Sequence, residues 1–151
     1  MTQAIRGFFG EYRFLSNFTV SEVEFDGVRY STVEHAFQAA KFDDVTYRET
    51  IRNAPTPGKA KRLGATRDYP LRAGWSDGLA MAVMSELVAK KFAGSERLKK
   101  QLLATGDAPL VETNDWGDDT WGDSTTTETP GRNQLGIILT AVRETIRTLE
   151  E

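Results

Sequence analysis

Residues 31–42, which read STVEHAFQAAKF, limit the possible folds more than any other stretch of the chain. The apolar residues recur at the i, i+3, i+4, i+7 spacing of one helical face, namely Val33, Ala36, Phe37 and Ala40. Glu34, Gln38 and Lys41 fall on a narrow arc beside that face. We therefore expect a short helix whose buried stripe is edged by an acid, an amide and an amine, where the wall of a pocket would lie.

The same polar residues also have a structural interpretation. Ser31 followed by Glu34 has the spacing of a capping box, in which the acid would hold backbone N–H groups at the start of the helix. Lys41 could be an exposed charge paired with Glu34 or Asp43. Spacing alone leaves both the structural and the chemical interpretation open.

The strands that the sequence predicts are short. Residues 22–30 read EVEFDGVRY, in which Asp26 and Gly27 separate two alternating runs, the pattern of a tight β-hairpin. This hairpin would lead directly into the helix at 31–42. Further short strands are expected at 5–8 and 109–113.

Helices account for most of the remaining chain. Several segments combine apolar periodicity with residues that start or stop helices, such as Pro57, Gly64, Ser76 and Ser95. These predicted helices span residues 45–52, 57–64, 77–92, 95–106 and 132–149. We see no internal repeat and no linker, so one domain over residues 1–151 is expected.

Composition excludes several classes of protein and site. The chain has 151 residues, no cysteine and a single histidine, His35, which excludes disulfides, thiolate chemistry and a histidine-rich zinc site. A net charge of −3 gives no overall basic field for nucleic acid. No apolar run is long enough to span a membrane, and the start does not resemble a signal peptide. We therefore expect a cytoplasmic protein.

A local basic segment could still bind phosphate. Its side chains come from Arg52, Lys59, Lys61, Arg62, Arg67 and Arg72. Guanidinium and ammonium groups bind phosphate well, although long charged side chains usually form nothing more than a solvated surface. Both interpretations remain open from the sequence.

Aromatic side chains accompany this charge. Trp75 follows the basic segment, and the irregular stretch 114–133 contains Trp121 among several acids. Tryptophan rings can stack on a planar base, although large aromatics more often pack in cores. A carboxylate can protonate a leaving nitrogen or activate water. Together these residue types favour a site that cleaves a nucleotide-like N-glycosidic bond.

The sequence resembles the YbiA/NADAR family of N-glycosidases. The matching segments occur in the family's order and cover nearly the whole chain: residues 14–18 (FLSNF), 31–42, 71–75 (LRAGW), 118–123 (DDTWGD) and 131–136 (GRNQLG). The resemblance implies a compact, mainly helical α+β fold with a small sheet. It implies no metal and no cofactor. Some members hydrolyse phosphoribosyl-bearing riboflavin-pathway intermediates, and others remove ADP-ribose from guanine in nucleic acid, sometimes as antitoxins.

The resemblance also assigns roles to residues. Glu34 would be the acid/base, Lys41 would lie beside the ribose C1″, and Asp118 would orient the sugar or its water. To attack an opened ribose at neutral pH, Lys41 would need a pKa well below the ordinary value of about 10.4. The substrate-binding candidates implied by the matching segments are Ser16, Asn17, Gln38, Arg72, Trp75, Trp121 and Asn133. Ser16 and Asn17 are also ordinary turn residues, and Asn133 could be a plain N-cap.

One departure from the family pattern concerns the rim of the site. After Trp121 and Gly122, residues 123–130 (DSTTTETP) replace a short glycine-rich turn.

The expected substrate is ADP-ribosylated guanine in DNA or RNA, which would make an ADP-ribosyltransferase toxin a possible partner. The alternatives are a phosphoribosyl pyrimidine of riboflavin biosynthesis and a module that binds ADP-ribose or NAD without turnover.

Overall fold

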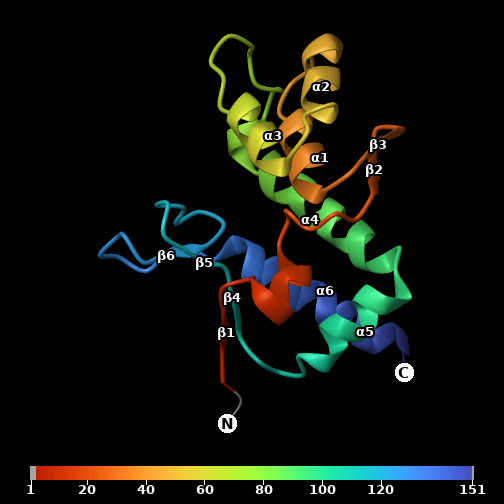
Figure 1. Ribbon diagram of the computed structural model, residues 1–151, viewed down its shortest axis with the longest axis vertical. Helices are drawn as coiled ribbons and strands as arrows, with labels where there is room; N and C mark the ends of the chain where they lie inside the picture. Colours follow the sequence, from red (N-terminus) through yellow and green to blue (C-terminus); the bar gives the residue numbers. More distant parts are fainter. Residues whose placement is uncertain (1–2, 151) are drawn as a thin grey trace. The chain divides into compact units, whose positions relative to one another are not determined.

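The computed structural model describes residues 3–150, and close contacts group the chain into two compact units. One unit is Asn17–Gly94. The other joins the chain up to Ser16 with the chain from Ser95 onward. Helices dominate both units and the strands are short, so the predicted α+β class is confirmed (Figure 1). The expectation of a single domain over 1–151 stays a prediction.

The unit Asn17–Gly94 begins with the predicted hairpin. Strands β2 (Val23–Phe25) and β3 (Val28–Tyr30) pair in antiparallel register. Asp26 and Gly27 have φ angles of 53° and 78°, as a two-residue turn with both residues in the left-handed region requires. The hairpin prediction is therefore confirmed, and its second strand ends just before the first helix.

Helix α1 is the centre of this unit. It contacts strand β2 and helices α2, α3 and α4 (Figure 1). Every residue of α1 is buried, including the polar ones, so the prediction of a single buried stripe was too narrow. The helices of this unit are α1 (Val33–Ala40), α2 (Val45–Arg52), α3 (Pro57–Gly64), the 3-10 helix η2 (Trp75–Asp77) and α4 (Leu79–Ala93).

Two helix starts differ from the prediction. Thr32, and not Ser31, caps α1, because its hydroxyl accepts the backbone N–H of His35 at 3.0 Å. Glu34 therefore does not complete a capping box begun by Ser31. Ser76 lies inside η2, and Gly78 occupies the N-cap of α4 with φ 109°. Only glycine adopts that angle without strain, so the chain turns there and not at the serine.

The other unit packs α5 against α6 and carries two small parallel sheets. Its helices are η1 (Gly10–Leu15), α5 (Glu96–Ala104) and α6 (Gln134–Glu150). Its strands are β1 (Ile5–Arg6), β4 (Leu110–Val111), β5 (Thr113–Asn114) and β6 (Asp123–Ser124). Strand β1 pairs with β4, and β5 pairs with β6, so the stretch predicted as irregular contains paired backbone. Across residues 3–150, no helix is both long and apolar enough to cross a bilayer.

Candidate functional site

Glu34 and Gln38 form a buried side-chain contact inside the unit Asn17–Gly94. Their side chains come from successive turns of α1, and the Gln38 amide Nε2 donates to a Glu34 carboxylate oxygen at 2.6 Å. Both residues are buried, at 8% and 5% exposure. The contact places the amide nitrogen of Gln38 toward Glu34. The Gln38 Oε1 atom faces the other way and has no hydrogen-bond partner among the described residues.

Lys41 follows one turn later and is half-buried. Its Nζ donates to the Gly64 carbonyl at 3.3 Å and lies 5.9 Å from the centre of the Phe37 ring. Burial lowers the pKa of this amine, the negative charge of Glu34 opposes that change, and the positive charge of Lys61 adds to it. A nucleophilic lysine needs a shift in this direction.

Asn17 contacts the start of the ridge, which is the row of Glu34, Gln38 and Lys41 along α1. Its backbone carbonyl accepts the N–H of Glu34 at 3.2 Å, and its side chain is buried. The amide nitrogen lies 3.5 Å from the sulfur of Met84, while Oδ1 has no hydrogen-bond partner within residues 3–150. Ser16 belongs to the other unit, where its N–H closes a turn onto the Arg13 carbonyl at 2.9 Å. The predicted pair is thus a turn residue followed by a buried amide next to the acid.

Arg72 is tied to the ridge through its backbone. Its N–H donates to the Lys41 carbonyl at 2.6 Å. The guanidinium lies between two carboxylates, 3.4 Å from Asp26 and 3.7 Å from Asp43. This charge pairing reduces the positive charge that Arg72 offers to a phosphate.

Trp75 is a packing residue in this structure. It is 7% exposed, and its ring centre lies 5.2 Å from that of Phe37. A ring buried in this way supports the core-packing alternative over an open stacking platform for a base. Trp75 therefore packs against α1 through its contact with Phe37.

Asp118 and Trp121 lie in the other unit, where they shape a loop. One carboxylate oxygen of Asp118 accepts the backbone N–H groups of Thr120 and Trp121, at 3.1 and 3.0 Å. Asparagine and aspartate commonly make such turns with their own backbone. A ligand contact for either residue stays a prediction.

Asn133 connects the start of α6 to Leu110 of strand β4 and to Glu112, which follows that strand. Its Oδ1 accepts the N–H of Glu112 at 3.0 Å, and its Nδ2 donates to the Leu110 carbonyl at 2.9 Å. Its side chain therefore bonds backbone groups outside its own helix, which is not the role of a plain N-cap. At the start of α6, the backbone N–H groups of Gln134 and Leu135 donate to the Thr120 and Trp121 carbonyls, at 3.1 and 3.0 Å. A ligand contact for Asn133 stays a prediction.

Glycines allow these segments to approach each other closely. A Cβ at Gly122 would lie 2.2 Å from the Glu112 carbonyl, and one at Gly136 would lie 2.1 Å from the Leu110 carbonyl. Because those neighbours are backbone atoms, they cannot move away cheaply. The glycines of the two C-terminal motifs are therefore needed for packing between the loop, β4 and α6.

Asn133 gives a prediction about stability. Asn133→Gly removes both side-chain hydrogen bonds and should lower the free energy of unfolding by about 2 kcal/mol or more, because it leaves backbone groups unpaired. Asn133→Ala should cost about 1 kcal/mol beyond that, since φ is 50° at this position and alanine is strained there. Urea unfolding of both variants measures the two effects. Equal stability of the variants would contradict the strain argument.

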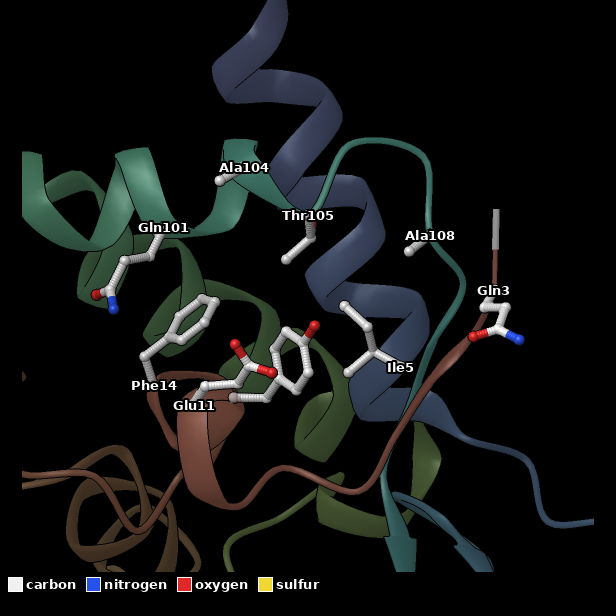
Figure 2. Close-up of a pocket in the computed structure, with 9 residues that line it drawn as sticks. Gln3, Ile5, Glu11, Phe14, Gln101, Ala104, Thr105 and Ala108 are labelled. Atoms are coloured by element: carbon white, nitrogen blue, oxygen red, sulfur yellow. The ribbon is translucent and has the colours of Figure 1, made fainter. Parts of the chain in front are cut away.

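A surface hollow of about 590 Å³ lies in the unit that contains α5 and α6, and none of the residues that line it is a predicted site residue. Figure 2 shows Glu11 and Phe14 from η1 facing Gln101, Ala104 and Thr105 at the end of α5. Among the described residues that line the hollow, Glu11 is the only acidic or basic one, and none of them offers a positive charge to a phosphate. The chemistry of the hollow does not match the predicted substrate.

Sequence reasoning missed two residues of the unit Asn17–Gly94. Gly64 touches both Gln38 and Lys41, which no periodic pattern indicates. Lys91 is buried at 2% exposure, and burial lowers the pKa of its amine to about 7. Its spacing from Leu87 and Val88 places it on the apolar face of α4, a signal that the sequence did contain. Within residues 3–150, no cluster of three or more His, Cys, Asp or Glu side chains could hold a metal ion.

Known proteins match almost all of this chain. Residues 6–147 match the NADAR domain family. N-glycosidase YbiA of Escherichia coli (strain K12) is 40% identical over 134 residues, which are 89% of this chain and 81% of that protein. An N-glycosidase of Nostoc punctiforme is 38% identical over 91% of this chain and 88% of its own length.

Two further similarities extend this result. A riboflavin biosynthesis protein of Vibrio vulnificus is 38% identical over 89% of this chain, which matches 35% of that longer protein. The NMR structure of Escherichia coli YbiA superposes with a TM-score of 0.84 at 38% identity, covering 100% of this chain and 90% of that one.

Proposed function

This chain belongs to the NADAR domain family, and on that premise we propose that it hydrolyses the N-glycosidic bond of an ADP-ribosylated guanine base in nucleic acid. Relatives from Escherichia coli and Nostoc punctiforme are named N-glycosidases, and the chain is accordingly a hydrolase acting on N-glycosyl bonds. The ADP-ribosyl guanine substrate is the finer part of the proposal. A cytoplasmic location and an antitoxin role against an ADP-ribosyltransferase would accompany it.

Glu34 is the proposed acid/base. The leaving guanine needs a proton as its bond to C1″ breaks, and a carboxyl group within reach can supply it. Gln38 holds one oxygen of Glu34 at 2.6 Å, so the carboxyl group is fixed in orientation before substrate binds. Pre-set orientation of this kind is what makes an acid effective in a site.

Lys41 is the proposed nucleophile. Its amine attacks C1″ as the bond to the base breaks, and opening of the sugar ring then gives a Schiff base that water hydrolyses to free sugar and amine. The reaction therefore consumes one water and returns Lys41 unchanged. The lowered pKa of Lys41 increases the share of neutral amine that can attack. This combination of a buried acid and a desolvated amine on one ridge is the observation that carries the proposal.

Helix α3 supplies positive charge next to this ridge. It carries Lys59, Lys61 and Arg62, and it packs directly on α1. Ammonium and guanidinium groups suit the diphosphate of ADP-ribose, and they also suit a single phosphate. Charge therefore supports a phosphorylated substrate without choosing between the two candidates.

A phosphoribosyl intermediate of riboflavin biosynthesis is the second candidate. It is favoured by the similarity to the Vibrio vulnificus protein, whose name places it in riboflavin biosynthesis. The decisive experiment incubates the protein separately with guanine-ADP-ribosylated DNA and with riboflavin precursors, and measures released base by mass spectrometry. Release from the DNA alone supports the first candidate, and release from the precursors alone supports the second. Binding of ADP-ribose without any release would instead support a non-catalytic module.

Lys61 provides a prediction about pH. Its charge lowers the pKa of Lys41, so Lys61→Gln should raise that pKa and reduce the neutral amine available at pH 7. At saturating substrate, the pH profile of Schiff-base formation should then shift to higher pH. Cyanoborohydride trapping of the Lys41 adduct across pH 5–10 measures the shift. Lys59→Gln, on the same helix, is the control and should leave the profile in place.

A further inference from the structure

We propose that Gly64, the last residue of α3, is a positioning residue that holds the Gln38 amide and the Lys41 amine of α1 in their working places. The absence of a side chain at Gly64 leaves room for the Gln38 amide, and the Gly64 carbonyl accepts a hydrogen bond from the Lys41 amine. The consequence for catalysis rests on the proposed function. The positioning itself can be measured without any substrate.

The first contact depends on the missing Cβ. A Cβ built at Gly64 would lie 1.9 Å from Gln38 Oε1 and 2.7 Å from Gln38 Cδ. Gly64 is buried, so the Gln38 side chain occupies the space that any other residue at position 64 would need. Helices α1 and α3 lie side by side there (Figure 1). Any other residue at position 64 therefore fits only if the Gln38 amide moves from its present place.

This contact reaches Glu34 through one hydrogen bond. Gln38 Oε1 lies against Gly64 and has no hydrogen-bond donor within the described chain, while its Nε2 is bonded to the Glu34 carboxylate. The amide group thus spans the distance between α3 and the acid. Any atom added at Gly64 pushes the amide and disturbs the 2.6 Å bond to Glu34, although Gly64 does not itself touch the acid.

The second contact uses the end of α3. The last carbonyls of a helix lack partners within the helix and carry the negative end of its dipole. The Gly64 carbonyl accepts Lys41 Nζ at 3.3 Å, and the preceding Leu63 carbonyl accepts the Tyr47 hydroxyl at 2.5 Å. The end of α3 therefore fixes side chains from two neighbouring elements, and one of them is the proposed nucleophile.

The test compares Gly64→Ala with Gly58→Ala in the same helix. A Cβ at Gly58 would meet its nearest atoms at 3.9 Å, which is ordinary contact, so this variant is a matched control. Neither glycine has a positive φ, and alanine is the better helix former, so helix propensity alone favours both changes. We expect Gly64→Ala to lower kcat on the order of tenfold to a hundredfold with little change in KM. Gly58→Ala should retain wild-type kinetics.

NMR of the side-chain groups gives a readout that is independent of turnover. In Gly64→Ala the Gln38 amide resonances should move, because the bond to Glu34 is disturbed, and in Gly58→Ala they should not. If wild-type protein cleaves none of the substrates, the proposed function fails while this spectrum still tests the positioning role. Unchanged Gln38 resonances in Gly64→Ala would overturn the inference.

A double variant guards against a simple loss of folding. Gln38→Ala removes the two side-chain atoms that a Cβ at position 64 would strike most closely. In that background Gly64→Ala should cause little further loss of kcat, because the two changes act through one contact. If Gly64→Ala alone fails to fold, the double variant should fold. Fully additive losses, or a double variant that also fails to fold, would overturn the inference.

Discussion

Replacement of Glu34 by glutamine is expected to lower kcat on the order of 10²–10⁴-fold while ligand binding is largely retained. Glutamine has nearly the same shape, and its side-chain oxygen can still accept the Gln38 amide as the carboxylate does at 2.6 Å. It cannot give a proton to the leaving base or take one from water. Folding should not suffer, because a buried neutral amide costs less to desolvate than a buried carboxylate.

Two measurements separate chemistry from binding in this variant. Release of base from the cleaved substrate reports kcat, and calorimetric titration with ADP-ribose reports affinity. Glu49→Gln is a suitable control, since Glu49 lies on the exposed surface and pairs with Arg52. Wild-type rates in Glu34→Gln would contradict the assignment of Glu34. A loss of affinity equal to the loss of kcat/KM would indicate a binding role in place of an acid/base role.

The ridge on α1 could be predicted because its geometry is local. Helical spacing fixes which side chains share an edge, and the structure joins Glu34 to Gln38 on that edge as the spacing predicts. Its caps were harder to predict, because Ser31 and Thr32 are adjacent residues of similar chemistry. Thr32 is the cap because it has the extended backbone, with φ −143° and ψ 161°, directly before the helix, and residue type does not determine where that conformation occurs. The burial of the whole helix depends on neighbours that single-helix periodicity does not describe.

The C-terminal motifs could not be assigned roles from sequence for a different reason. Asp118 and Asn133 are residue types that serve a ligand and a backbone equally well. Which partner they take depends on tertiary contacts, such as the bonds from Asn133 to Leu110 and Glu112, more than 20 residues away. Gly64 is the extreme case, since its importance lies in the space that it leaves empty, and space of that kind is visible only once two helices are packed.

Substitution of Lys41 is the second change that we expect to cause a large loss of activity. Lys41→Met removes the amine and Lys41→Arg keeps a positive charge that is never neutral at accessible pH. If the amine is the nucleophile, both variants should lose trapping by cyanoborohydride completely and lose kcat on the order of 10³-fold or more. If Lys41 served only as a positive charge beside Glu34, Lys41→Arg would keep most of the activity. Substantial turnover by Lys41→Arg would therefore exclude the Schiff-base route.

Stability provides an independent check on the same amine. Burial lowers the pKa of Lys41 in the folded protein, so the unfolded chain binds this proton more readily. The half-buried amine must therefore destabilise the fold at neutral pH, and stability should rise as pH passes from the folded pKa toward the ordinary value of about 10.4. Lys41→Met should be more stable than wild type at pH 7, and its stability should rise less than that of wild type. The buried amine of Lys91, whose pKa is lowered to about 7, should supply the rise that remains. Urea unfolding at pH 7 and pH 10 measures both, and a Met variant less stable than wild type at pH 7 would show that desolvation of the amine is not its dominant energetic effect.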